Sequence, residues 1–238
     1  MTSGYRIFKT AACLLLILVM LTGCTSTLWT VKSFFVKEPR VKMTPESLYA
    51  RGSQEFQHGS YKKAREFYTR LKEEYPLHEM AILAELGVAD AYYSVKDYVE
   101  AEGAYRDFLM MHPTNENVPY VMYQIGMCHY QQIGSVDRDQ TETIKALREF
   151  ERLVARFPQS QFATLAEKMI RDCKQKLAEH EFYVGNFYFK QKKYDAALKR
   201  FETIRREYAG AGLDYRTERY IEEIRARLAA IESKEAAK

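Results

Sequence analysis

The strongest constraint on the fold is a spacing of residues that recurs four times between residues 48 and 209. Each copy holds two small residues, an aromatic residue four positions after the second small one and, in three copies, a closing proline. The copies are Leu48, Gly52, Tyr61, Ala64, Tyr68, Leu71, Pro76; Glu85, Ala89, Tyr98, Ala101, Tyr105, Phe108, Pro113; Met122, Gly126, Ala146, Phe150, Leu153, Pro158; and Gly185, Tyr194, Ala197, Phe201, Ile204, with Ala209 in place of proline. Four copies in order predict a repeat architecture.

Each copy predicts a pair of antiparallel helices. The small residues of the two helices are expected to face each other and to let the backbones approach closely. The aromatic residue lies one helical turn further on the same face and fills the space beside them. The prolines end the second helix and start the turn to the next unit. This pattern resembles the tetratricopeptide repeat of about 34 residues, so we expect an all-α, tetratricopeptide-repeat superhelix (α-solenoid).

Two departures from the pattern carry further predictions. The third unit has a polar loop at residues 134–139 between its helices. The stretch from Ser160 to Lys190 contains no helix breaker except Gly185, so it predicts one long helix capped by Ser160. Its excess length is close to four turns, which preserves the packing face. A final helix at about 215–232 should cover the last repeat, because each repeat leaves an apolar face open.

The start of the chain has the features of an export signal. Arg6 and Lys9 precede an apolar run, residues 11–21, which is shorter than the roughly 20 residues of a membrane-spanning helix. The run ends in Leu-Thr-Gly followed by Cys24, which resembles the lipobox of bacterial lipoproteins. The resemblance implies that Cys24 carries a diacylglycerol and an N-acyl chain. An ordinary cysteine after an ordinary signal is the alternative. Thr25, where an aspartate would resemble a retention signal, favours the outer membrane.

These features divide the chain into residues 1–23, a lipoprotein signal peptide; 24–43, a lipidated tether; and 44–238, a tetratricopeptide-repeat domain of about four repeats plus a capping helix. Thr44 should cap the first helix, with Pro45 at its first position. The tether mixes aromatic and basic residues, which suits either a membrane surface or packing on the first repeat. Cys128 and Cys173 remain in the mature chain, and we expect buried free thiols there rather than a disulfide.

Composition and motifs indicate no nucleic-acid binding, metal site or catalysis. Lys and Arg number 36 against 32 Asp and Glu, and no basic block points to nucleic acid. The histidines are His58, His78, His112, His129 and His180, and none stands at metal-ligand spacing from a carboxylate or cysteine. His129 lies on an expected core helix and should be a hydrogen-bonded interior residue. We therefore expect no catalytic residues, no metal and no cofactor besides the covalent lipid.

The remaining candidate site is a surface. In tetratricopeptide proteins the first helix of each unit lines a groove that takes peptides or partner segments. The same register here gives Tyr49, Ser53 and Phe56 in the first unit, Leu86, Asp90 and Tyr93 in the second, and Tyr123, Met127 and Tyr130 in the third. Aromatic residues give much contact area at low ordering cost. Some of the nine should instead pack between helices, and we expect about half to be accessible.

Four segments point to one family among the proteins that contain this repeat. They are Tyr120–Tyr123 followed by Gly126, the loop Gly134–Asp139, the run Phe157–Gln161 and the run Leu177–Val184. Together with the lipobox they resemble the BamD (ComL) family. That resemblance implies a lipid-anchored protein on the periplasmic face of the outer membrane.

In that family the C-terminal repeats bind the periplasmic domains of a BamA-like β-barrel protein. The N-terminal repeats are implicated in engaging other assembly lipoproteins and unfolded outer-membrane protein precursors. The resemblance assigns the BamA-type contact to Lys199 and Arg200. The sequence departs from the family at its end, where one helix replaces an expected pair, which puts the C-terminal partner surface in question.

A second interpretation is another tetratricopeptide lipoprotein that acts in pilus, secretin or envelope assembly. It shares the anchor and the repeats but does not explain the loop at 134–139. An enzyme or solute-binding protein is a third class, and no constellation of residues supports it. An essential gene would favour barrel assembly, whereas a viable deletion that lacks only pili would favour the second interpretation.

Overall fold

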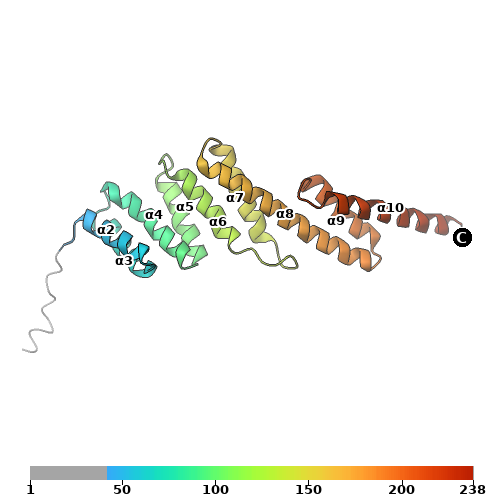
Figure 1. The fold of residues 1–238 in the computed structure, drawn as a ribbon, viewed down its shortest axis with the longest axis horizontal. Helices are drawn as coiled ribbons and strands as arrows, with labels where there is room; N and C mark the ends of the chain where they lie inside the picture. Colours follow the sequence, from blue (N-terminus) through green and yellow to red (C-terminus); the bar gives the residue numbers. More distant parts are fainter. Residues whose placement is uncertain (1–41, 238) are drawn as a thin grey trace, which may run out of the picture. The chain divides into compact units, whose positions relative to one another are not determined.

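The computed structural model describes residues 42–237. By its contacts the chain divides into Met1–Met43 and Thr44–Lys238, and the description below concerns the second unit. Cys24 and the tether residues up to 41 lie outside the described part. All regular elements in that part are α-helices, and consecutive helices pack against each other (Figure 1). The prediction of an all-α, tetratricopeptide-type solenoid is confirmed.

The helices follow the predicted pairs. They are α2 (Pro45–Gln57) and α3 (Tyr61–Glu74), α4 (Glu79–Ser94) and α5 (Tyr98–Met111), α6 (Val118–Tyr130) and α7 (Thr141–Arg156), α8 (Gln161–Lys190) and α9 (Tyr194–Glu207), and α10 (Asp214–Ala236). The three closing prolines each follow the end of a second helix by two residues. The long helix is confirmed, and α10 extends the predicted final helix by a few residues at its C-terminal end. No helix of the described residues combines the length and apolar character that a membrane span requires.

Helix caps begin α2 and α8 where the sequence places them. The Thr44 hydroxyl accepts a hydrogen bond from the backbone N–H of Ser47 at 3.2 Å, and Pro45 is the first helical residue. The Ser160 hydroxyl likewise accepts from the backbone N–H of Phe162 at 3.2 Å. Both caps satisfy donors that the first turn of a helix leaves unpaired, so both predictions are confirmed.

The glycines of the repeat make room for a ring. A Cβ atom at Gly126 would lie 2.5 Å from the ring of Phe150 on the second helix, and one at Gly52 would lie 2.6 Å from Tyr68. At Gly185 the ring of Phe201 would be 3.0 Å away. The repeat pattern predicts that each glycine faces the small residue of the second helix. The nearest side-chain atoms are instead those of the aromatic residue four positions later.

Three core clusters follow one another along the chain, and α8 takes part in two of them. The first joins α4, α5 and α6, and the second joins α6, α7 and the N-terminal half of α8 through Ala166 and Cys173. The third begins at Ala178 and joins the C-terminal half of α8 to α9 and α10. Helix α8 therefore covers the third helix pair with one half and forms the fourth pair with the other.

The two cysteines of the described part are buried and free, as predicted. Cys128 belongs to the first core cluster and Cys173 to the second. Burial raises the pKa of each thiol to about 12. Both side chains therefore act as small apolar core residues rather than as reactive thiolates.

The predicted polar loop of the third unit is also confirmed, because residues 131–140 lie between α6 and α7. The buried side chain of Gln140 fixes it. Its amide donates to the backbone carbonyls of Ser135 at 3.2 Å and Arg138 at 3.0 Å, and its oxygen accepts from the hydroxyl of Thr143 at 2.8 Å. The loop is thus held by hydrogen bonds on both sides of its turn.

Replacing Gly126 with alanine should destabilise the protein by about 1–3 kcal/mol, because the added methyl group meets the fully buried ring of Phe150 and overpacks it. Gly103→Ala is the matched control. No atom lies within 4 Å of a Cβ at that exposed helical position, so this substitution should stabilise by up to about 1 kcal/mol. Urea unfolding of both variants measures the two effects. Equal free energies of unfolding would refute the packing described here.

Candidate functional site

The nine predicted groove residues lie on α2, α4 and α6, the first helices of three successive pairs. Leu86 is buried, and the other eight keep part of their surface accessible, which is more than the expected half. Each of the nine side chains nevertheless contacts a neighbouring side chain, and we call this set the first-helix face. The face is Tyr49, Ser53, Phe56, Leu86, Asp90, Tyr93, Tyr123, Met127 and Tyr130.

Hydroxyl groups of tyrosines tie this face to the second helices. The hydroxyls of Ser53 and Tyr68 are hydrogen-bonded at 3.2 Å. The Tyr105 hydroxyl donates to Asp90 at 2.5 Å. Ser53 and Asp90 occupy the same place in their repeats, directly after the small residue. In the third unit, where the ring is Phe150, that place holds the apolar Met127; in the fourth, where the ring is Phe201, it holds Asn186, which accepts from the Tyr220 hydroxyl of α10 at 3.4 Å. A ring hydroxyl therefore predicts a polar partner, and the printed sequence carries this signal.

Asp90 is the centre of the largest cluster on this face. Its carboxylate accepts hydrogen bonds from Tyr105 and, at 2.6 Å, from the hydroxyl of Tyr120, which in turn accepts from the amide of Gln124 at 3.0 Å. Burial raises the pKa of Asp90, and the two tyrosine hydroxyls oppose that rise only in part. The side chain is fixed between α4, α5 and α6 rather than directed freely at solvent.

The aromatic members of the face are packed edge-on or tilted against neighbouring rings. Ring centroids of Tyr93 and Tyr98 are 5.4 Å apart, and those of Tyr123 and Phe150 are 5.7 Å apart. The Tyr130 hydroxyl donates to Asp172 of α8 at 2.6 Å. Such contacts fix rotamers before any partner binds, which lowers the entropic cost of binding. The arrangement can present pre-ordered aromatic surface to an extended or helical segment.

The second predicted contact lies on α9. The guanidinium of Arg200 donates to both carboxylate oxygens of Glu181 on α8, at 3.1 and 3.2 Å. Its side chain is still partly exposed, and Lys199 beside it is exposed. Both bonds come from the single nitrogen Nη1, and a partly exposed pair of this kind contributes at most about 1 kcal/mol to stability. The positive charge stays available at the surface in a fixed orientation.

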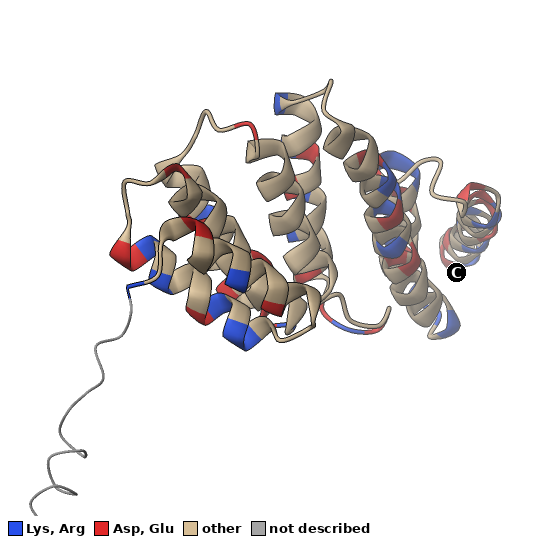
Figure 2. Ribbon diagram, turned by 60° about the vertical axis from the view of Figure 1, so that its left-hand side comes forward, with Lys and Arg blue, Asp and Glu red and all other residues tan. Residues whose placement is uncertain are grey.

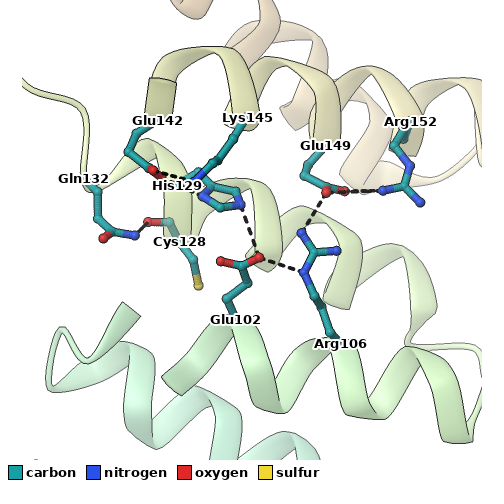
Figure 3. A network of polar contacts seen from close by, with 9 residues as sticks. All are labelled: Glu102, Arg106, Cys128, His129, Gln132, Glu142, Lys145, Glu149 and Arg152. Atoms are coloured by element: carbon teal, nitrogen blue, oxygen red, sulfur yellow. Dashed lines mark hydrogen bonds and ion pairs between the residues drawn. The ribbon is translucent and has the colours of Figure 1, made fainter. Parts of the chain in front are cut away.

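A polar network that the sequence pattern does not predict lies between the second and third pairs (Figure 3). His129, 4% exposed, faces Glu142 at 2.8 Å through Nδ1 and Glu102 at 3.4 Å through Nε2. Arg106 bridges Glu102 at 2.7 Å and Glu149 at 2.9 Å. The prediction that His129 is a hydrogen-bonded interior residue is confirmed. Its partners come from α5 and α7, so the spacing of residues within α6 could not predict them.

This network has the character of a structural tie. Burial alone would raise the pKa of Glu142, but hydrogen bonds from Lys145 and His129 outweigh it and lower that pKa. Carboxylates and cations of α5 and α7 neutralise one another in this network. Among residues 42–237 no group of three His, Cys, Asp or Glu is placed to hold a metal ion. Figure 2 shows Lys and Arg interspersed with Asp and Glu along the helices.

A stack of helix pairs with a pre-ordered aromatic face defines the class of tetratricopeptide-type solenoids. Residues 41–238 match the family model described as "YfiO: Outer membrane lipoprotein", and the chain belongs to this family. The resemblance to BamD proteins is thereby confirmed.

Two curated relatives, from Caulobacter vibrioides and Rickettsia prowazekii, are both named "Outer membrane protein assembly factor BamD". The first is 30% identical over 159 residues, which cover 67% of this chain and 52% of the relative. The second is 30% identical over 200 residues, which cover 84% of this chain and 76% of the relative. The match therefore spans about half the length of the Caulobacter protein.

A solved structure of a tetratricopeptide repeat protein from Parabacteroides merdae has a TM-score of 0.45 to this chain at 16% identity. The alignment covers 82% of this chain and 70% of that one. The fold assignment rests on the helix pairs described above.

Asp90→Asn should change how stability depends on pH. The folded-state pKa of Asp90 is raised, so the stability associated with its protonated form is fully present below the unfolded value of about 3.9 and is lost as pH rises through the folded value. Asparagine keeps an oxygen that accepts from both tyrosines and does not ionise. The difference in free energy of unfolding, variant minus wild type, should therefore increase between pH 4 and pH 7.

Chemical denaturation at the two pH values measures this difference, and Asp107→Asn, an exposed position on α5, is the control. A difference between Asp90→Asn and wild type that stays constant with pH would contradict the buried, tyrosine-bonded carboxylate.

Proposed function

We propose that this protein is a non-enzymatic assembly factor of the outer-membrane β-barrel machinery and that it acts by binding other proteins. The observation that carries the proposal is family membership over residues 41–238, together with relatives named as outer membrane protein assembly factors. The helix-pair scaffold supports it, because its ordered faces suit recognition of protein segments. Its described polar clusters are neutralised ties rather than acid–base or nucleophilic constellations.

The protein would be held at the periplasmic face of the outer membrane by lipid on Cys24. The lipobox-like sequence and the family description support this anchor. A diacylglycerol with an added acyl chain buries enough methylene groups for stable attachment, at about 0.8 kcal/mol each. Recovery of the mature chain in the soluble fraction with a free Cys24 thiol would contradict the anchor.

The first-helix face would engage unfolded barrel precursors or partner lipoproteins. An extended precursor segment alternates its side chains, so its aromatic residues could stack on Tyr93 and Tyr123, whose rings are already ordered. The partial exposure of eight of the nine residues supports this use. Photoreactive residues at these two tyrosines that never crosslink to a barrel precursor or an assembly lipoprotein would count against it.

The C-terminal pairs would bind the periplasmic domains of a BamA-like barrel protein, with Lys199 and Arg200 at the contact. The ion pair with Glu181 holds the Arg200 guanidinium in one orientation while part of it remains exposed. A partner carboxylate could then approach a pre-positioned cation, which is favourable for specificity and for the rate of association. Exchanging the charges of Arg200 and Glu181 can separate a role of Arg200 in packing from a role in binding.

Arg200→Glu should weaken binding of the full chain to purified periplasmic domains of a BamA-like protein by at least about tenfold, because it places two carboxylates at the contact. The double variant Arg200→Glu/Glu181→Arg restores an ion pair between α8 and α9 but leaves the charge at position 200 reversed. It should bind as poorly as the single variant in a biosensor titration.

Arg148→Glu makes the same charge change at an exposed position on α7 and should bind like the wild type. If the double variant regained full affinity, Arg200 would serve only the packing of α8 on α9, and the proposed contact would be wrong.

A further inference from the structure

The C-terminal half of α8 carries apolar side chains that remain uncovered. Tyr183 is 51% exposed and Phe187 is 52% exposed, four residues apart and so one turn apart on the same side of the helix. Val184 lies between them and is partly buried, and His180 lies one turn before. We call His180, Tyr183, Val184 and Phe187 the α8 face. Large aromatic residues exposed side by side mark a surface that needs an explanation.

The repeat register shows what this face would normally meet. Counted from the small residue of each first helix, Val184 and Phe187 correspond to Ile125 and Cys128 of α6. Those two are fully buried in the cluster that α6 forms with α5, the second helix of the preceding pair. Tyr183 corresponds in the same way to Gly87 of α4, where an added Cβ would lie 2.6 Å from Tyr68 of α3. In both earlier pairs, these positions of the first helix are covered by the second helix of the preceding pair.

The length of α8 removes that cover from the fourth pair. The segment between the closing proline and the next small residue is about 14 residues longer here than in the earlier units, which displaces the fourth pair by roughly 21 Å along the helix axis. The third pair is instead covered by the N-terminal half of α8, through Ala166 and Cys173. The side of α8 that would abut a preceding second helix is therefore left without one.

Two features bound the α8 face along the helix. At one end His180 donates from Nδ1 to the backbone carbonyl of Val136 at 2.7 Å, which places the 134–139 loop beside it. At the other end Lys190, Lys192 and Lys193 are exposed, and none of them takes part in the ion pairs of the described residues. The distance from residue 180 to residue 190 is about 15 Å, the length of roughly three helical turns.

We propose that the α8 face docks an amphipathic α-helix of another protein that presents an apolar side together with acidic residues. The register argues for a helix, because α3 and α5 occupy the equivalent place in the earlier pairs. The three lysines argue for acidic flanks by charge complementarity. This inference does not rest on the proposed function, since it concerns a different surface and a probe that contains no barrel protein.

The probe is a fluorescent, lactam-bridged peptide with the chain's own sequence 98–112. This is the segment of α5 that packs on the equivalent positions of α6, and it bears Glu100, Glu102 and Asp107. Its partner peptide has lysine at those three positions. Fluorescence anisotropy with the full chain in detergent should give tighter binding of the acidic peptide by about tenfold.

Tyr183→Ala/Phe187→Ala should lower that affinity by at least about tenfold, as expected for central aromatic anchors. Leu165→Ala, at a 47% exposed position on the same helix, should leave it unchanged. Glutamine at Lys190, Lys192 and Lys193 should weaken binding and reduce its dependence on salt. Thermal melting of the variants should match the wild type, since all the altered side chains are accessible.

Three results would overturn the proposal. They are equal binding of the two peptides, unchanged binding by the double alanine variant, and no measurable binding of the acidic peptide. Sedimentation velocity adds a fourth. A dimer of the full chain that Tyr183→Ala/Phe187→Ala dissociates would make a second copy of this chain the occupant in place of another protein.

Discussion

The contact on which this structure depends is a ring pressed against a glycine. In three of the four pairs the second helix lays an aromatic ring on a glycine of the first helix, where an added Cβ would lie only 2.5, 2.6 or 3.0 Å from the ring. The ring is fully or almost fully buried, so the separation of the two helix axes follows from its thickness. Every further surface is built on that separation, because the residues beside the glycine are aimed by the same helix. Ser53, directly after Gly52, is within reach of the Tyr68 hydroxyl for this reason.

Much of the fold was open to prediction because its determinants are local. Spacing along one helix pair specifies which residues face each other, and caps such as Thr44 and Ser160 act within a few residues of themselves. The positions of the first-helix face follow from the same register. Beyond the positions bonded to a second-helix tyrosine, the sequence could not supply the partners of the polar groups. Glu102 and Glu142 lie 27 and 13 residues from His129, and their convergence depends on how successive pairs stack.

The internal pairing changes how charged residues are interpreted. Arg200 looks like a free cation in the sequence, and its bond to Glu181 makes it a positioned one. The network around Arg106 shows the opposite case, in which cations and carboxylates from α5 and α7 neutralise one another and leave little net charge for a partner. A charge on a repeat protein is therefore informative only together with the neighbouring pair. That information enters through packing, which a single sequence does not display.

Helix α8 has a consequence for how such proteins can change over time. A single residue inserted between Cys173 and Ala178 would turn everything that follows by about 100° relative to what precedes it. Both core clusters of α8 could then no longer be satisfied at once. Only length changes near whole numbers of turns keep the phase, and the additional 14 residues meet that condition at close to four turns. The helix is therefore a spacer whose length can change only in steps of about one turn. The distance between the surfaces before and after it can take only a few values in related chains.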